Sequence, residues 1–180
     1  ANQRQPRDPD DSDMTSLPGS PDPDARFGHK TEKKTFFGYK QHIGVDADSD
    51  FITNVATSGG NISDDDYLMA MVEGPPPDAV TADKLYDKPH HHRRLKDKKI
   101  KSLIIRKKTS PTPDSLDYLI AIKQRKLIER VFAVTKKYHG GRRARYWGLP
   151  RVRVQNLMIA TVFNLKLLAQ RLTSNLGEVC

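Results

Sequence analysis

The order of strand-like and helix-like segments most narrows the folds that this chain can adopt. Two runs rich in β-branched and aromatic residues, 35–45 and 51–57, flank the aspartate-rich turn 46–50 and predict a β-hairpin. Short apolar runs at 79–82 and 102–106 predict two more strands, and helices are expected at 63–71, 89–97, 115–137 and 152–172. Strands that alternate with helices in this way indicate an α/β fold.

Composition divides the 180 residues into three parts. Residues 1–24 hold prolines and aspartates with almost nothing apolar, and we expect a disordered or loosely draped segment. Residues 25–173 form one domain, since a chain of this length with 36% apolar residues can bury a single core. Residues 174–180 are expected to be a flexible tail.

Targeting signals and cysteine pairing are not evident. The sequence has no run of about 18 apolar residues and no charged start followed by an apolar stretch, so we expect neither a membrane span nor a signal peptide. These features predict a cytoplasmic protein. The single cysteine, Cys180, cannot form an internal disulfide and is interpreted as a bystander.

Charge is distributed unevenly along the chain. The net charge is +9, but residues 1–83 hold 16 acidic against 7 basic side chains, and residues 84–180 hold 6 acidic against 24 basic. A basic half of this strength attracts nucleic acid through the release of counterions. A ribosome-like surface or a simply solvated basic surface is the alternative that charge alone leaves open.

Two acidic residues far apart in the sequence stand out as candidates for chemistry. Asp83 follows the apolar run 79–82, at the end of a predicted strand. In the predicted helix 115–137, Arg125, Glu129 and Lys136 fall at about 0°, 40° and 20° around the axis, which makes one polar stripe. The opposite face is apolar and holds Leu116, Ile120, Leu127, Val131 and Val134.

This combination resembles the signature of DDE-type insertion-sequence transposases, whose third catalytic carboxylate lies between such an arginine and lysine. The resemblance runs through the segments 22–26, 37–42, 60–64, 81–86, 125–136, 154–157 and 164–167. Two positions depart from the family pattern, because Leu85 stands where glycine is usual and Ile122 where tyrosine is frequent. Neither departure removes a carboxylate.

The resemblance implies a ribonuclease H-like fold, a mixed sheet with flanking helices. In that fold a central first strand bears the first catalytic aspartate, and no such strand is evident here. The aspartates at 8, 10, 11, 13, 22 and 24 do not follow an apolar run that could be a buried strand. We therefore expect the C-terminal part of a transposase catalytic domain, truncated and inactive alone.

The resemblance also implies divalent-metal chemistry. Carboxylates that hold Mg²⁺ (or Mn²⁺) can activate an attacking oxygen and stabilise a leaving one at a phosphodiester. Asp83 and Glu129 are the implied metal ligands and catalytic residues, while Arg125 and Lys136 would orient Glu129 and meet DNA phosphates. The residues alone also allow Asp83 to cap the next turn and Glu129 to pair with Arg125 on the helix surface.

A basic stretch after the long helix is a candidate DNA contact. It contains two adjacent glycines, and Trp147 could stack on an unpaired base or instead anchor the loop to the last helix. The candidate DNA-binding residues are Lys137, Arg142, Arg143, Arg145, Trp147, Arg151 and Arg153.

The histidine run 90–92 invites comparison with a zinc site. Structural zinc takes four spaced ligands, and the sequence offers no cysteine pair or second histidine cluster, so a solvated loop is expected here.

The leading functional prediction is metal-dependent cleavage and strand transfer at insertion-sequence ends. Its partners would be double-stranded DNA of the transposon ends and the target, with a homodimer in the DNA complex and association with the nucleoid. The alternatives are a catalytically dead, basic DNA-binding remnant of a transposase and a small ribonuclease H-like nuclease.

Overall fold

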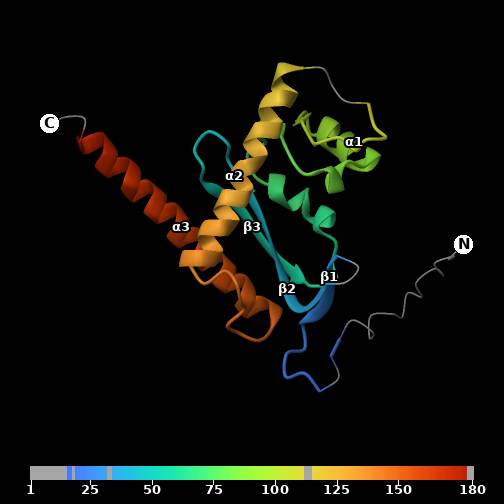
Figure 1. The fold of residues 1–180 in the computed structure, drawn as a ribbon, viewed down its shortest axis with the longest axis vertical. Coiled ribbons are helices and arrows are strands. Elements are labelled where there is room, and N and C mark those ends of the chain that lie inside the picture. The colour runs from blue at the N-terminus through green and yellow to red at the C-terminus, as the bar shows by residue number, and fades with distance from the viewer. Residues whose placement is uncertain (1–15, 18, 32–33, 112–114, 178–180) are drawn as a thin grey trace, which may run out of the picture.

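The computed structural model describes residues 16–17, 19–31, 34–111 and 115–177. Figure 1 shows the long helix α2 crossing in front of β3, with α1 on one side of α2 and α3 on the other. Helix α3 packs against β3. The elements in chain order are β1 (Arg26–Thr31), β2 (Lys34–Val45), β3 (Ile52–Gly59), η2 (Asp64–Tyr67), η3 (Ala70–Val72), β4 (Ala79–Val80), η4 (Lys84–Tyr86), α1 (Pro89–Asp97), β5 (Lys101–Ser102), α2 (Leu116–Tyr138) and α3 (Leu149–Gly177).

The predicted hairpin is confirmed. β2 and β3 pair antiparallel from Tyr39 opposite Gly59 to Val45 opposite Ile52. β1 also pairs antiparallel with β2, but no strand was expected there, because its six residues carry little β-branched or apolar signal. The close approach of β1 to the end of β3 requires glycine, since a Cβ on Gly28 would lie 2.2 Å from the Gly60 carbonyl oxygen.

The two later strands form a separate parallel pair. Backbone N–H groups of Leu103 and Ile105 donate to the carbonyls of Val80 and Ala82 at 2.8 and 2.9 Å, so the pairing continues beyond the assigned strands. The predicted strands 79–82 and 102–106 are confirmed in this form. In the described part of the chain the strands therefore make a three-stranded and a two-stranded sheet, not the single mixed sheet that was expected.

The predicted helix at 63–71 is wrong in type. The segment forms the two 3₁₀ turns η2 and η3, and the Ser63 side chain makes no capping hydrogen bond. Leu68 is buried as expected, but Val72 is buried in place of the expected Met71. Three consecutive aspartates at the start favour a tight turn over a regular helix, because short polar side chains compete for backbone hydrogen bonds.

The helices α1, α2 and α3 match the predicted helices 89–97, 115–137 and 152–172, with α3 longer at both ends. Ser115 caps α2, since its hydroxyl oxygen accepts a hydrogen bond from the Tyr118 backbone N–H at 3.2 Å. None of the described helices is long and apolar enough to cross a membrane.

The expected apolar face of α2 holds only for its C-terminal half. Val131 is buried, but Leu116 and Ile120 are 72% and 44% exposed. Tyr118 and Ala121 are buried in their place because the first turns of α2 pack on the parallel strands. The helix thus buries one face against the parallel strands and another against the hairpin and α3, whereas the sequence pattern predicted a single buried stripe.

The core consists of two clusters. One joins η2, η3, α1 and the parallel pair through Leu68, Val72, Leu95, Ile100 and Ile104. The other joins the hairpin to α2 and α3 through Ile43, Ile52, Val131 and Ala160. The Asn164 amide adds a polar clamp in the second cluster, since it accepts from the Ile52 N–H at 2.9 Å and donates to the Ile52 carbonyl at 2.8 Å.

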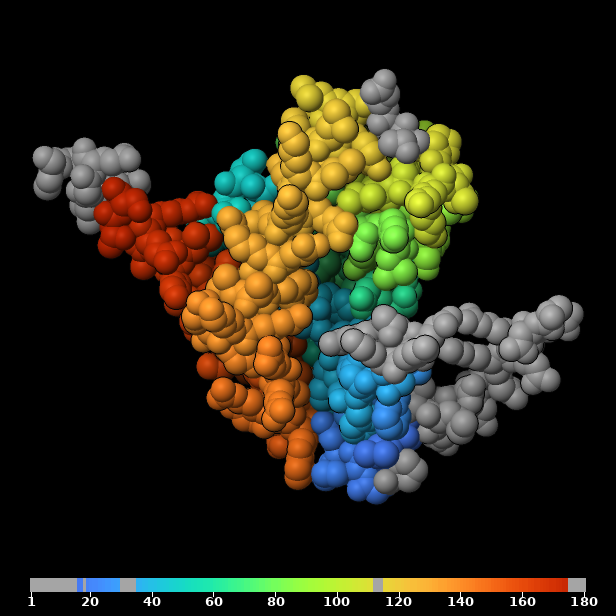
Figure 2. Space-filling view, viewed as in Figure 1, coloured from blue at the N-terminus to red at the C-terminus, as the bar shows by residue number. Residues whose placement is uncertain are grey.

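The segment before β1 differs from the loosely draped one expected, as far as it is described. Asp22 Oδ1 accepts hydrogen bonds from the Tyr39 hydroxyl at 2.5 Å and from the Gly148 N–H at 3.1 Å. Asp24 Oδ2 accepts from the Leu149 N–H at 2.7 Å. Figure 2 shows the blue N-terminal residues beside the orange segment at the lower end of the molecule. These aspartates tie the segment to the start of α3; residues 1–15 and 178–180 lie outside the described residues.

Truncation of a core leucine tests the first cluster. Leu95 has no exposed surface, so we expect Leu95→Ala to lower the free energy of unfolding by about 2–5 kcal/mol. Urea denaturation followed by circular dichroism measures this change. Leu116→Ala, at a position 72% exposed, is the matched control and should change it by less than about 0.5 kcal/mol. Equal losses in both variants would contradict the assignment of the core.

Candidate functional site

Asp83 lies at the carboxyl end of β4 and begins the turn η4. Its Oδ1 accepts a hydrogen bond from the Lys84 backbone N–H at 2.6 Å, so the capping role that the sequence allowed is present. Oδ2 points instead to α2, and the side chain is 46% exposed. One carboxylate oxygen therefore serves the local turn and the other remains available at the surface.

Arg125 brings Asp83 and Glu129 together. Its Nη2 lies 3.0 Å from Glu129 Oε1 and 3.9 Å from Asp83 Oδ2. Because both oxygens contact one nitrogen, they are at most 6.9 Å apart, the sum of those two distances. The structure thus places two acidic groups that are remote in the sequence beside the same guanidinium nitrogen.

Other candidates lie farther from this pair. The Lys136 ammonium sits 5.1 Å from the centre of the Phe132 ring, and no ion pair with Glu129 is present among the described contacts. No third histidine, cysteine or acidic residue of the described chain joins Asp83 and Glu129 in a three-ligand group. The described residues therefore supply two carboxylates for a cation at this place.

The basic stretch between α2 and α3 is a pinned turn. Gly140 adopts a φ of 71°, and Gln155 of α3 accepts from the Arg145 N–H and donates to the Arg143 carbonyl, both at 2.9 Å. Trp147 is 61% exposed, so it does not bury itself against the last helix. The side chains of the other expected DNA contacts are also exposed: Lys137, Arg142, Arg143, Arg145, Arg151 and Arg153.

The histidine run lies in the first turns of α1, the helix predicted at 89–97, so the expectation of a solvated loop for these three residues is wrong. His91 is buried and its Nε2 lies 3.4 Å from the buried Asp65 carboxylate, which also accepts hydrogen bonds from Ser63 and Lys88. Asp65, His90 and His91 could each offer one metal-ligand atom, all within 4.8 Å of one another. The Lys88 ammonium already balances the Asp65 charge, however, so the arrangement works as an ion pair between α1 and η2.

A second buried carboxylate, Asp87, was missed in the sequence analysis, as were the two cations Lys107 and Lys108 near it. The run of three basic residues 106–108 at the end of a predicted strand was the signal that could have identified them. No pattern in the sequence marks Asp87, because its partners come from two separate segments, α1 and residues 106–110.

Comparison with known proteins gives one consistent result. The family model described as "Transposase DDE domain" matches residues 11–165. The transposase for insertion sequence element IS1106 from Neisseria meningitidis serogroup B is 29% identical over 160 residues, which cover 86% of this chain and 55% of that protein. The chain thus spans about half the length of this curated relative. No solved structure matches.

The Asp65 ion pair predicts a specific loss of stability in acid. Burial raises the pKa of Asp65, but hydrogen bonds from Lys88, Ser63 and His91 outweigh it and lower the pKa from 3.8 to about 2. The ionised carboxylate therefore stabilises the fold above about pH 4, by about 2 kcal/mol, and this contribution is lost as the pH falls towards 2. Urea titrations at several pH values should show this loss.

Asp65→Asn is the test of that assignment. The variant should be less stable at neutral pH and should show a flatter dependence of unfolding free energy on pH between about 4 and 2. Asp66→Asn, an exposed neighbour, should keep the dependence of the parent chain. An unchanged slope in Asp65→Asn would show that another carboxylate dominates.

Proposed function

The chain belongs to the family of transposases with a DDE domain, and from that premise we propose that it acts in divalent-metal-dependent cleavage and strand transfer of phosphodiester bonds at insertion-sequence ends. In this proposal Asp83 and Glu129 are the metal ligands. Arg125 and Lys136 are supporting residues that contact DNA phosphate.

The observation that carries the proposal is the shared position of Asp83 and Glu129 around Arg125. Two carboxylates that lie at most 6.9 Å apart beside one guanidinium nitrogen, from distances of 3.0 and 3.9 Å, form a local negative centre that attracts cations and that a metal ion could occupy. Both side chains are partly exposed, at 46% and 62%, so a bound ion would keep several waters. Oxygen ligands and retained water are the preference of Mg²⁺.

The residues present fit such an ion in chemistry. When bound, Mg²⁺ or Mn²⁺ would stabilise the charge that gathers on phosphorus and on the leaving oxygen. Asp83 would hold its position through the hydrogen bond from Lys84, while Glu129 is carried by a rigid helix. Arg125 would move from the carboxylates to a phosphate oxygen, to which its planar group can donate two hydrogen bonds.

Two carboxylates are fewer than this chemistry uses. The relative from Neisseria is a longer protein, of which the alignment covers 55%. We propose that a further carboxylate completes the metal site and that the described residues alone bind the ion weakly and cleave poorly. The ribonuclease H-like fold is part of the same proposal, since a central strand between the two sheets would supply both the missing ligand and the sheet continuity.

Double-stranded DNA is the proposed partner. The exposed cations of the turn before α3 and of its first residues lie on one segment, where they can neutralise neighbouring phosphates. The exposed Trp147 is free to stack on an unpaired base at a cleaved end. We include in the same proposal a homodimer in the DNA complex and association with the nucleoid.

One observation favours a second candidate function, a DNA-binding remnant without metal. Arg125 already pairs with both carboxylates, so one of their two negative charges is balanced without an ion. A small nuclease of the same fold would differ from both candidates by cutting DNA without preference for an insertion-sequence end.

Metal binding separates the two leading candidates. We expect Mn²⁺, followed by electron paramagnetic resonance of the free ion, to bind the chain and to bind Asp83→Asn or Glu129→Gln roughly tenfold more weakly, because each variant keeps one carboxylate of two. Asp66→Asn removes an exposed aspartate elsewhere and is the control. Equal affinity in all four proteins would favour the DNA-binding remnant.

Arg125 provides an independent test of the same site. If it occupies the position of the cation, Arg125→Gln should bind Mn²⁺ several-fold more tightly than the parent chain, since a competing positive charge is gone. The same variant should bind duplex DNA more weakly. Arg130→Gln, which breaks the exposed pair with Asp50, is the control of equal charge. Tighter Mn²⁺ binding in both variants would indicate a general charge effect.

A further inference from the structure

A basic turn lies beside Asp83 at the same edge of the parallel pair. The Ile105 N–H donates to the Ala82 carbonyl at 2.9 Å, so the two strands end side by side, one leading into Asp83 and the other into Arg106. The carboxyl ends of parallel strands are where α/β sheets place ligand-binding groups. We name residues 106–110 the basic turn; it closes with a hydrogen bond from the Ser110 N–H to the Lys107 carbonyl at 2.9 Å.

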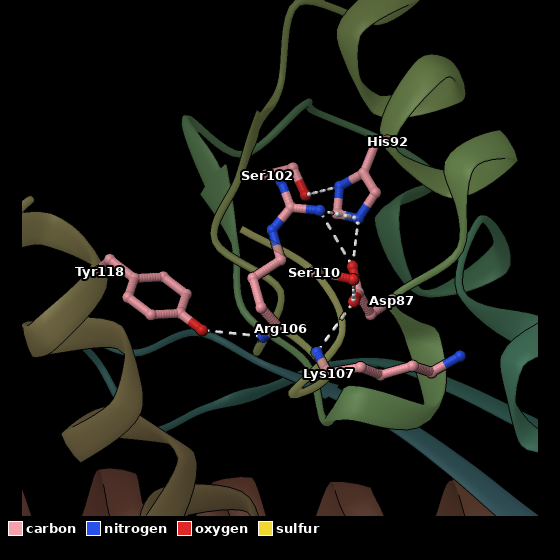
Figure 3. Close-up of polar contacts among 7 residues, drawn as sticks. All are labelled: Asp87, His92, Ser102, Arg106, Lys107, Ser110 and Tyr118. Atoms are coloured by element: carbon pink, nitrogen blue, oxygen red, sulfur yellow. Dashed lines mark hydrogen bonds and ion pairs between the residues drawn. The ribbon is translucent and has the colours of Figure 1, made fainter. Parts of the chain in front are cut away.

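The Asp87 carboxylate holds the basic turn through hydrogen bonds from the backbone of the turn and from the Arg106 side chain. Its carboxylate accepts hydrogen bonds from the Lys107 N–H at 2.9 Å, the Ser110 hydroxyl at 2.8 Å and Arg106 Nη1 at 3.0 Å, and it lies 2.9 Å from His92 Nε2. The Asp87 side chain is 3% exposed, so these contacts are shielded from water. Figure 3 shows the carboxylate at the centre of this group.

A second anchor fixes the turn to α2. The Arg106 N–H donates to the Tyr118 hydroxyl oxygen at 2.8 Å, and Tyr118 is itself buried. His92 is held in turn by Ser102, whose hydroxyl lies 2.8 Å from His92 Nδ1. The backbone of the turn is therefore fixed from two sides before any ligand arrives.

The lysine side chains are left out of this network. Figure 3 shows the Lys107 side chain extending away from Asp87 while its backbone nitrogen faces the carboxylate. Lys107 and Lys108 are exposed, and neither ammonium has an acidic partner among the described ion pairs. Lys101, on the strand that leads into the basic turn, contrasts with them, because it pairs with Asp117.

We propose that the basic turn is a preset phosphate-binding site for duplex DNA next to the bond that is cut, with Lys107 and Lys108 as the contacting cations and Asp87 as the positioning residue. This inference rests on the proposed function and adds to it a contact surface on the strand beside Asp83, remote in sequence from the basic stretch before α3. A fixed backbone presents the two ammonium groups without the entropy cost of ordering the turn on binding.

Duplex binding tests the lysines. Fluorescence anisotropy with a labelled duplex should show that Lys107→Gln/Lys108→Gln binds roughly tenfold more weakly at about 0.1 M salt. The slope of log affinity against log salt should also fall by about 2, one unit for each lysine that no longer neutralises a phosphate. Lys96→Gln/Lys98→Gln removes the same charge at the C-terminal end of α1, before the amino end of β5, and should lower affinity less than about threefold.

Asp87→Asn tests the positioning role. The variant loses one negative charge, so a purely electrostatic surface would bind DNA as tightly or more tightly, whereas a preset turn should bind several-fold more weakly. Circular dichroism reports whether the variant is folded, and the two lysine variants decide the question if it is not. Equal losses in the two double-lysine variants would overturn the proposal.

Metal binding distinguishes this inference from the proposed function. Lys107→Gln/Lys108→Gln should bind Mn²⁺ as the parent chain does, because neither lysine contacts Asp83 or Glu129 in the described contacts. If the parent chain binds no Mn²⁺ but the lysine variant loses DNA affinity, the result supports the basic turn and rejects the metal site. If the parent chain binds Mn²⁺ but the lysine variant keeps its DNA affinity, the result rejects the basic turn alone.

Discussion

The parallel pairing of residues 78–82 with 101–105 is the constraint on which the candidate site depends. It fixes the residue that follows each strand, and so places Asp83 and the basic turn at one edge. Neither strand is long enough to be stable alone, and the pair relies on Leu95, Ile100 and Ile104 beneath it. Packing in this small cluster therefore also sets the position of Asp83, so a buried leucine contributes to the placement of a surface carboxylate.

Helix α2 connects the two halves of the molecule. Its first turns meet the parallel pair through Tyr118 and Ala121, and its later turns enter the second core cluster at Val131. Glu129 is carried between these two contacts, so its distance from Asp83 is set by packing at both ends of a rigid rod. An exposed ion pair such as that with Arg125 is worth little by itself, and the backbone framework must do most of the positioning.

The sequence predicted the elements well and their partners poorly. The hairpin, the strand before Asp83 and the three α-helices follow from β-branched runs, capping residues and apolar periodicity, which are local signals. β1 was missed because a glycine, a histidine and two cations dilute its pattern, and the contact of Gly28 with Gly60 that admits it is remote in sequence. The site shows the same limit: the acidic pair could be chosen by spacing and resemblance, whereas Asp87 collects its partners through tertiary structure.

The uneven distribution of charge along the sequence has a structural consequence. Each acidic residue buried among the described ones, Asp65 and Asp87, neutralises a basic partner from the basic part of the chain, residues 84–180: Lys88 or Arg106. These paired cations stabilise the fold. Other cations, such as Lys107 and Lys108, are exposed and have no acidic partner among the described ion pairs. The buried carboxylates cost desolvation energy, so they are a poor way to gain stability alone. The buried carboxylates instead fix the position of a backbone segment that carries exposed cations. The affinity for a polyanion such as DNA is highest when these cations are held in place before it binds.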